Sequence, residues 1–227
     1  MFNIQYQLIS SGETTGKVPG WKFAKREITV RIILATKNKK KVEELTRMFA
    51  GRAITFETLD AFPGCPDVIE DGRTFRQNAA KKAVAIARYT GCPALADDSG
   101  LEVDALGGAP GVYSARYAGK DANDRNNVKK LLKNMKDISD PNKRTARFVC
   151  CLALALPDGR CKTFSGHVRG TIGRRARGFS GFGYDPVFCP LGHDRTFAEM
   201  TADEKDGLSH RGRAIGKFYV YLKRVLD

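Results

Sequence analysis

The sequence predicts an α/β protein with a mixed β-sheet. Its 227 residues make one large domain or two small ones, enough to bury a sizeable core without disulfide bonds. Strand and helix patterns alternate along the first half of the chain, which favours parallel strands joined by helices. Two strand-like segments then flank Pro157-Asp158-Gly159-Arg160, a turn sequence typical of an antiparallel hairpin. A helical pattern closes the chain, so we expect both strand directions in one sheet.

The first predicted element is a strand at residues 30–35, where Val, Ile and Leu dominate. A helix should follow, because apolar residues recur at helical spacing at Val42, Leu45, Met48 and Phe49. A second short strand is expected at residues 53–56, before a loop at residues 60–71 that is rich in Pro, Gly and acidic residues. Another apolar stripe indicates a second helix that includes Phe75, Ala79, Ala83 and Ile86.

The later elements follow from the same signals. A strand after Gly91-Cys92-Pro93 delivers the acidic pair Asp97-Asp98. Asp121 and Asn123 are candidate caps of the next helix, and Ser209 is the candidate cap of the last one. The expected helix, two hairpin strands and final helix occupy residues 122–134, 147–156, 161–168 and 209–225. We interpret Phe188, in a strand-like run, as an ordinary core residue.

The chain is strongly basic. Its net charge is +14, from 39 Lys and Arg against 25 Asp and Glu. Such a charge favours nucleic acid, an anionic membrane surface or phosphorylated small molecules. No apolar run approaches the roughly 18 residues of a membrane helix, and the N-terminus is a poor signal peptide. The six cysteines lack zinc-ligand spacing, so we expect free thiols in a cytoplasmic protein without a membrane partner.

Residues 1–27 are rich in Ser, Thr and Gly, and we interpret them as an N-terminal extension of a domain at residues 28–227. Within the extension, residues 12–18 resemble a phosphate-binding P-loop. However, their glycines are one residue too close and Val18 replaces the hydroxyl residue that would hold magnesium. The sequence therefore does not support a P-loop.

Residues 36–41 are a better candidate for phosphate binding. They follow the first strand and open the first helix, and backbone N–H groups at a helix N-terminus attract anions. Three consecutive lysines add full positive charge, although they could instead form a solvated helix face. The candidate phosphate-binding residues are Thr36, Lys37, Asn38, Lys39, Lys40 and Lys41.

The pair Asp97-Asp98 is the clearest candidate for chemistry. Two adjacent carboxylates follow an apolar strand and precede a Ser-Gly turn. Because like charges repel, such a pair is costly unless a cation is bound near it. Mg²⁺ prefers carboxylate and water oxygens, and a carboxylate beside it can take a proton from water.

Five motifs occur together and in order, and the set resembles the inosine triphosphate pyrophosphatase family over roughly residues 28–226. The motifs are Ala35-Thr36-x-Asn38-x-x-Lys41, Ala96-Asp97-Asp98-Ser99-Gly100-Leu101, the segment 106–116, Gly181-Phe182-Gly183-Tyr184-Asp185-Pro186, and Ser209-His210-Arg211. The resemblance implies an elongated mixed sheet flanked by helices. It also implies magnesium-dependent hydrolysis of dITP, ITP and XTP to the monophosphate and pyrophosphate, which cleanses the nucleotide pool, and a homodimer.

The resemblance also implies roles for individual residues. Asp98 matches the general base, which also contacts magnesium, and Glu70 matches the second metal-ligand carboxylate. Thr36, Asn38 and Lys41 match the triphosphate-binding segment. The other expected substrate contacts are Ser99, Phe182, Gly183, Tyr184, Asp185, Lys205, His210 and Arg211.

Hydrogen bonding could explain how this predicted site distinguishes one purine base from another. Hypoxanthine and xanthine carry a carbonyl where adenine carries an amino group, so a site of N–H donors would leave donors unpaired against adenine. Backbone N–H groups of residues 182–185, with His210 and Arg211, could supply these donors. Phe182 or Tyr184 could stack on the purine.

Two further readings of the sequence compete with this one. Septum-inhibitor-type pyrophosphatases act on other modified nucleotides, but their Ser-x-Arg-Arg phosphate segment is absent here. A basic nucleic-acid-binding protein would fit the charge, but no basic motif interleaved with aromatics appears, so we expect no specific nucleic-acid partner. The chain also departs from the family at Gln77, where many members have Glu, and weaker magnesium binding would follow if that Glu organises the metal.

Overall fold

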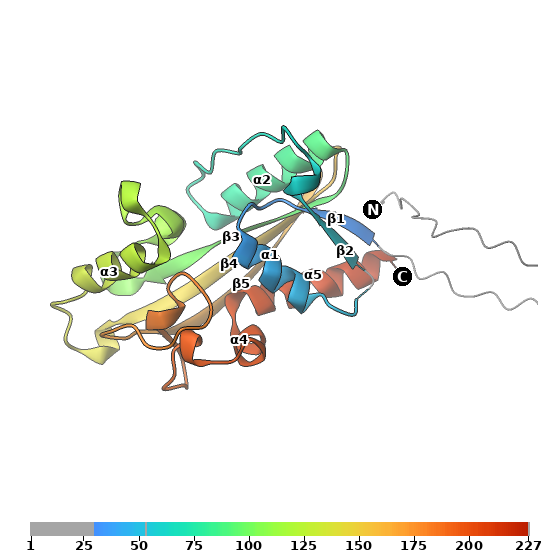
Figure 1. The fold of residues 1–227 in the computed structure, drawn as a ribbon. Helices are drawn as coiled ribbons and strands as arrows, with labels where there is room; N and C mark the ends of the chain where they lie inside the picture. Colours follow the sequence, from blue (N-terminus) through green and yellow to red (C-terminus); the bar gives the residue numbers. More distant parts are fainter. Residues whose placement is uncertain (1–29, 53, 227) are drawn as a thin grey trace, which may run out of the picture.

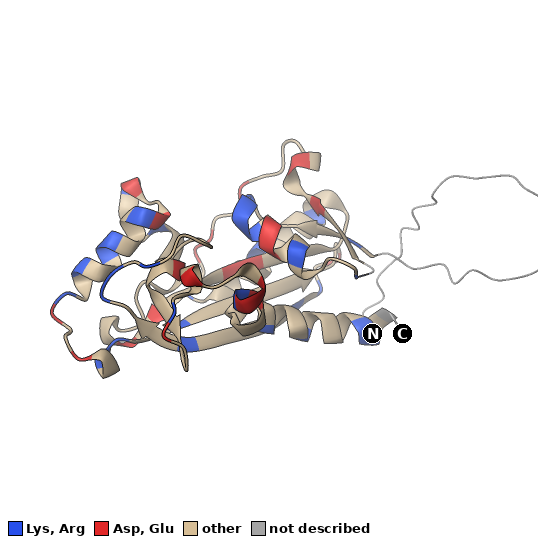
Figure 2. Ribbon diagram, turned by 60° about the horizontal axis from the view of Figure 1, so that its bottom comes forward, with Lys and Arg blue, Asp and Glu red and all other residues tan. Residues whose placement is uncertain are grey.

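The computed structural model describes residues 30–52 and 54–226 (Figure 1). The predicted N-terminal extension and the discarded P-loop sequence therefore lie outside the described residues. Among the residues that are described, no helix is both long and apolar enough to cross a membrane. Lys and Arg residues alternate with Asp and Glu residues along much of the ribbon (Figure 2).

The sheet has six strands in the order β2-β1-β3-β4-β5-β6. Their bounds are Val30–Leu34 for β1, Ile54–Thr58 for β2, Ala94–Val103 for β3, Thr145–Ala155 for β4, Cys161–Ile172 for β5 and Phe188–Pro190 for β6. β1 is parallel to both β2 and β3, and every later pair is antiparallel. The prediction of a mixed sheet is therefore confirmed.

Five α-helices accompany the sheet within the described part of the chain: Lys39–Met48 (α1), Phe75–Thr90 (α2), Asp124–Asn134 (α3), Ala202–Leu208 (α4) and His210–Leu226 (α5). Asn123 rather than Asp121 caps α3, and the Ser209 hydroxyl accepts the Gly212 N–H at the start of α5. The sequence did not predict α4, and it indicated β6 only as a strand-like run at Phe188. α4 does carry a sequence signal, because Thr201 and Glu204 form a capping box.

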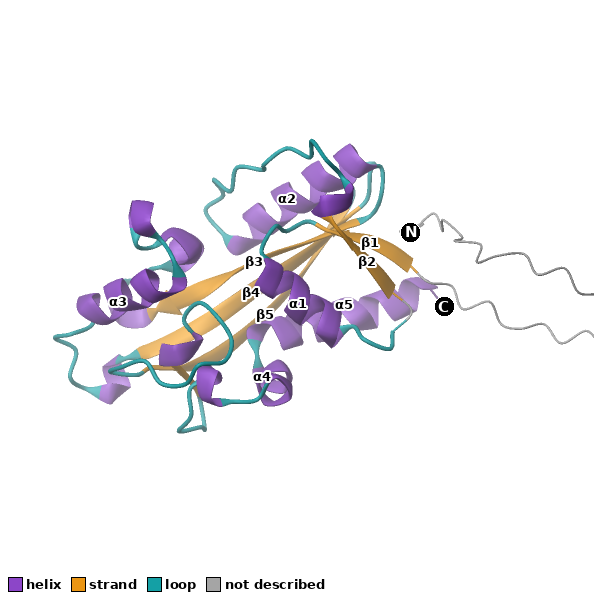
Figure 3. Cartoon of the chain, viewed as in Figure 1, coloured by secondary structure: helices purple, strands orange, loops and turns teal. Residues whose placement is uncertain are grey.

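The helices cover the sheet on two faces. α2 packs on one face, while α1 and α5 pack on the other (Figure 3). Cys150 and Cys151 on β4 contribute to opposite cores, as strand alternation predicts. A third core lies toward α3, where Phe188 is fully buried against Phe148, as expected.

α5 lies so close to β5 that a side chain cannot fit between them at one point. A Cβ added at Gly166 would lie 2.1 Å from the His210 carbonyl oxygen and 2.6 Å from the Ala214 nitrogen. Only glycine allows this approach. The contact fixes the start of α5, and with it the position of His210 and Arg211.

The short pairing of β1 with β3 creates the place for a site. β1 stops after the pair Leu34–Leu95, while β3 continues to Val103. Beyond that pair, the β1-facing edge of β3 has no strand neighbour within residues 30–52 and 54–226. β2 and β3 lie on opposite sides of β1, so the connections that follow β1 and β2 run in opposite directions. Ligands of α/β sheets commonly bind at such a switch point.

Candidate active site

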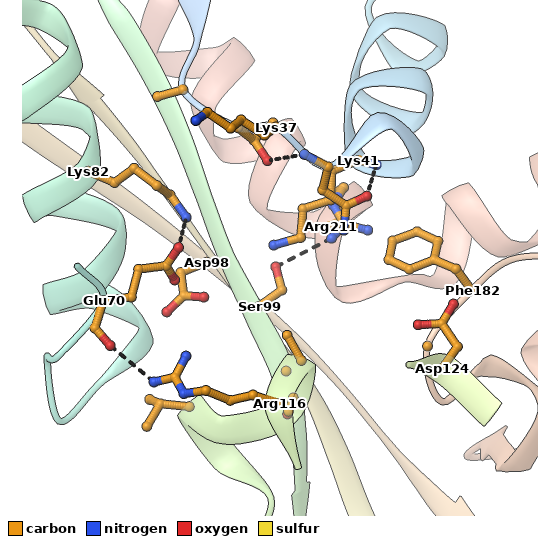
Figure 4. A pocket seen from close by; sticks show the side chains of 18 of the residues that line it. Lys37, Lys41, Glu70, Lys82, Asp98, Ser99, Arg116, Asp124, Phe182 and Arg211 are labelled. Carbon is orange, nitrogen blue, oxygen red and sulfur yellow. Dashed lines mark hydrogen bonds and ion pairs between the residues drawn. The ribbon is translucent and has the colours of Figure 1, made fainter. Parts of the chain in front are cut away.

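A cavity of about 400 Å³ opens beside this free edge of β3. Its volume is typical of small-molecule sites. Segments from residues 35 to 211 meet around it (Figure 4). The predicted site residues that line it are Thr36, Lys37, Asn38, Lys41, Glu70, Asp98, Ser99, Phe182, Gly183, Tyr184, Asp185, Lys205, His210 and Arg211. Lys39 and Lys40 do not line the cavity.

Asp98 enters the cavity from the middle of β3 and is only 6% exposed. Its Oδ2 is buried and has no hydrogen-bond partner among the described residues. Burial, with a smaller contribution from Glu70, raises the pKa of Asp98 to about 6, although Lys41 and Lys82 oppose the shift. A carboxyl with this pKa is mostly ionised at neutral pH and is well suited to accept a proton.

Glu70 faces Asp98 from the loop before α2, held at two points. Lys82 Nζ lies 2.9 Å from Glu70 Oε1, and Arg116 Nη2 donates to the Glu70 carbonyl oxygen at 3.1 Å. Figure 4 shows these side chains around Asp98. Lys82 was missed by sequence reasoning. Helical spacing could have found it, because it lies seven residues after the buried Phe75, on the same face of α2.

Asp97 is fully buried and fully paired. Lys41 Nζ lies 2.6 Å from its Oδ1 and Arg211 Nε lies 2.9 Å from its Oδ2, while the Ser99 hydroxyl also donates to Oδ1. Burial alone would raise the pKa of Asp97, but Arg211 and Lys41 hold it well below its usual range. The carboxylate is therefore occupied within the chain, whereas Asp98 is not.

Asp97 belongs to a larger buried array that sequence reasoning did not foresee. Glu44, on the inner face of α1, contacts both Arg211 and Lys205, and Lys205 Nζ also lies 2.6 Å from Asp185 Oδ2. We call this array the ion-pair network; its members are Lys41, Glu44, Asp97, Asp185, Lys205 and Arg211. Three cations and three carboxylates alternate, which satisfies charges that would be costly to bury alone. Glu44 lies three residues after Lys41 and precedes the buried Leu45, and this was its only sequence signal.

The aromatic residues of the 182–185 loop have different environments. Tyr184 is 3% exposed, and its hydroxyl donates to the Ser114 carbonyl oxygen at 2.8 Å. Of the two residues expected to be able to stack on a purine, Tyr184 is therefore the less suitable, because its ring is packed in the core. Phe182 faces the cavity instead, with the Lys205 and Arg211 cations 5.1 and 5.6 Å from its ring centre.

The backbone of the same loop is already engaged. The Phe182 N–H donates to Asp185 Oδ2, the Asp185 N–H to the Phe182 carbonyl, and the Gly183 N–H to Asp124. These three groups are not free to recognise a base, contrary to expectation. His210 is better placed: it is buried, stacks on Phe148, and its Nδ1 has no hydrogen-bond partner within the described chain. Burial and the neighbouring Arg211 hold its pKa well below the usual range, so the ring is neutral.

The start of α1, where the sequence predicted phosphate binding, also borders the cavity. The Asn38 side chain caps α1 by accepting the Lys41 N–H at 3.2 Å. Lys41 also donates to the Asp97 carbonyl oxygen at 3.3 Å. Lys40 itself does not line the cavity, but it lies 2.8 Å from Asp124, which does. The cavity therefore has a cationic end at α1 and a carboxylate pair at β3.

The carboxylate pair fits the hard cation that the family resemblance implied. The described residues contain no group of three or more His, Cys, Asp or Glu that could enclose a metal. Mg²⁺ does not need one, because it is commonly held by one or two carboxylates together with substrate phosphates and water. Asp98, with an unpartnered buried oxygen, and Glu70 supply such a pair.

Comparison with known proteins decides the family. A sequence model of the Ham1 family matches residues 32–221. The chain belongs to the Ham1 family. The resemblance derived from the five ordered motifs is thus confirmed.

Several Ham1 relatives match almost end to end. A dITP/XTP pyrophosphatase of Streptomyces avermitilis is 48% identical over 86% of this chain and 98% of the relative. The protein of the same name from Desulforamulus reducens is 47% identical over 86% of this chain and 97% of its own length. Among solved structures, a HAM1 protein from Coxiella burnetii matches with a TM-score of 0.79 and 40% identity over 86% of this chain and 100% of that one.

Proposed function

We propose that this chain hydrolyses non-standard purine nucleoside triphosphates, namely dITP, ITP and XTP, to the monophosphate and pyrophosphate, and so cleanses the nucleotide pool. The observation that carries the proposal is the buried Asp98 carboxylate facing Glu70, in a cavity that also presents Lys41 and Lys205. Ham1 relatives that are nearly half identical carry the name dITP/XTP pyrophosphatase.

The carboxylate pair supports magnesium dependence. When bound by Asp98 and Glu70, Mg²⁺ would supply charge neutralisation at the phosphate oxygens. Asp98 accepts the proton of the attacking water, a role that its raised pKa of about 6 and its position in the cavity lining favour. Lys41, Lys82 and the N-terminus of α1 neutralise the charge that develops on the phosphates.

Base recognition belongs to the other end of the cavity. Phe182 offers a ring face for the purine, and the neutral His210 offers its unpartnered Nδ1. Arg211 lies next to His210 but is bound to Asp97 and Glu44, so its main contribution is to hold the wall in place. Discrimination against adenine then rests on leaving a buried polar group unpaired.

A nucleotide panel tests this function. We expect pyrophosphate release from dITP, ITP and XTP to exceed release from dATP and dGTP by at least about 100-fold in kcat/KM, a ratio that hydrogen-bonding sites achieve. Removal of Mg²⁺ with a chelator should stop the reaction, and added Mg²⁺ should restore it. Equal turnover of all nucleotides would contradict the specificity, and release of orthophosphate instead of pyrophosphate would contradict the reaction.

We also propose that the enzyme is a cytoplasmic homodimer. All six cysteines are free, which suits a reducing compartment. Phe179 and Leu191 are large exposed apolar side chains, of the kind that association covers. Sedimentation equilibrium measures the mass directly, and a monomer at micromolar concentration would contradict the dimer.

A further inference from the structure

The first turn of α2 carries a buried amide to which the proposed mechanism gives no role. Asn78 is 1% exposed and does not line the cavity. Its Oδ1 accepts the Gly72 N–H at 2.7 Å, and Gly72 is two residues after Glu70. Because an amide nitrogen could not accept that bond, the contact fixes the orientation of the Asn78 side chain.

The NH₂ group of the Asn78 amide lies near Asp98. Asn78 Nδ2 is buried without a hydrogen-bond partner among the described residues, and the same is true of Asp98 Oδ2. Burial raises the pKa of Asp98, and the Asn78 amide is close enough to counteract that shift by favouring the ionised form. A buried donor beside a buried acceptor, both otherwise unpaired, gains free energy when the two meet.

The close contact between Asn78 and the loop leaves no room for a side chain at position 72. A Cβ at position 72 would lie 2.6 Å from Asn78 Oδ1 and 2.8 Å from the Cβ of Gln77, so only glycine allows the contact. Gln77 supports the same loop differently, because its Oε1 accepts the Arg73 N–H at 2.8 Å while the residue stays exposed. Gln accepts this bond as well as Glu would, and Gln77 does not line the cavity, so its replacement of Glu need not weaken metal binding.

We propose that Asn78 is the positioning residue of the carboxylate pair, an inference that rests on the proposed function. Its carbonyl oxygen anchors the loop that carries Glu70, and its N–H group engages Asp98 Oδ2. Asp98 Oδ1 is then the oxygen left to face the cavity. One side chain thus sets the relative position of two carboxylates that lie 28 residues apart in the sequence.

Asn78→Leu tests the inference, because it keeps the approximate volume, adds no charge and removes both contacts. We expect kcat for dITP to fall by about 10–100-fold, as for other residues that orient metal ligands, with KM changed little. In a Mn²⁺ titration followed by electron paramagnetic resonance without nucleotide, the dissociation constant should rise by a similar factor. Arg76→Gln, at an exposed position two residues away on α2 and outside the cavity lining, is the matched control and should leave both quantities close to wild type.

A purely structural role would give a different result. If Asn78→Leu lowers the melting temperature but retains wild-type kcat and Mn²⁺ affinity, the inference is overturned. If Asn78→Leu does not fold, Gly72→Ala is the second test, because its methyl group would displace the Asn78 amide. This variant should show the same losses of kcat and Mn²⁺ affinity. Wild-type values for Gly72→Ala would also overturn the inference. A wild-type protein that hydrolyses no nucleotide of the panel contradicts the proposed function instead, while the Mn²⁺ comparison still judges Asn78.

Discussion

Asp97 and Asp98 are neighbours on β3, but their side chains lie in opposite electrostatic surroundings. Asp97 is fully buried and bound by Lys41, Arg211 and Ser99, and its pKa lies well below its usual range. Asp98 has one buried oxygen without a partner, and burial raises its pKa to about 6. The ion-pair network around Asp97 thus builds the wall of the site, and the incomplete pairing around Asp98 leaves a group available for chemistry.

Removal of the Asp98 charge should have the largest effect on activity. Asp98→Asn should lower kcat by about 10²–10⁴-fold, the range for loss of a general base, because an amide cannot take the proton. The melting temperature should change little, since Asp98 has no strong internal partner to lose. Coupled detection of pyrophosphate measures the rate. Activity within a few-fold of wild type would remove Asp98 from its proposed role.

Disruption of the ion-pair network should affect stability instead. Glu44→Gln leaves Lys205 and Arg211 with an incomplete set of counter-charges, so we expect a loss of about 3–5 kcal/mol in the free energy of unfolding. Urea denaturation measures it. Glu43→Gln, one residue away and exposed, is the matched control and should cost less than about 0.5 kcal/mol.

The Glu44 effect should depend on pH with a definite sign. Burial raises the pKa of Glu44, but Arg211 and Lys205 outweigh it and hold the pKa below its ordinary value of 4.5. The stabilisation from these pairs is therefore complete above the unfolded pKa, about 4.3, and is lost as the pH falls through the lower folded value. The difference between wild type and Glu44→Gln should be constant near neutrality and shrink in acid. A difference that grows in acid would contradict this charge assignment.

Substitutions of the two aromatic residues in the 182–185 loop should have different effects, one on substrate binding and the other on stability. Phe182→Leu should raise KM for dITP by about 5–100-fold, because stacking on a base is worth about 1–3 kcal/mol. Tyr184→Phe should leave KM near wild type but lower the unfolding free energy by about 1–3 kcal/mol, since the Ser114 carbonyl loses its donor. Steady-state kinetics and denaturation of both variants make the comparison. A higher KM for Tyr184→Phe than for Phe182→Leu would reverse the assignment.

The smallest effect is expected at the rim. Lys40 and Asp124 form a half-exposed pair, and Asp124 also accepts the Gly183 N–H. Lys40→Ala should cost at most about 1 kcal/mol in unfolding free energy, as exposed pairs do. Thermal denaturation at low and high salt checks this, and the difference from wild type should vanish at high salt. A larger loss that persists in salt would place Lys40 within the ion-pair network.

The sequence predicted the local features of the fold and site better than the long-range ones. Helical stripes and caps located α1, α2, α3 and α5, because those signals lie within a few residues of one another. Asp98 and Glu70 were found through motif order. Glu44 was not, since its partners lie 161 and 167 residues away and a Glu among lysines on a helix looks solvated. The backbone N–H groups of Phe182, Gly183 and Asp185 were expected to be free because their bonds to Asp185, Asp124 and the Phe182 carbonyl are evident only after folding.

The early end of β1 has a consequence for the whole sheet. The Leu95 carbonyl accepts the Ala35 N–H, so the Asp97 carbonyl, two residues on, faces the same vacant side, where Lys41 Nζ donates to it. A side chain thus replaces the hydrogen bond that a longer β1 would have made. The edge is protected against pairing with another chain, although it stays open to a small molecule. An insertion that lengthened β1 would therefore extend the sheet and, at the same time, block the active-site cavity.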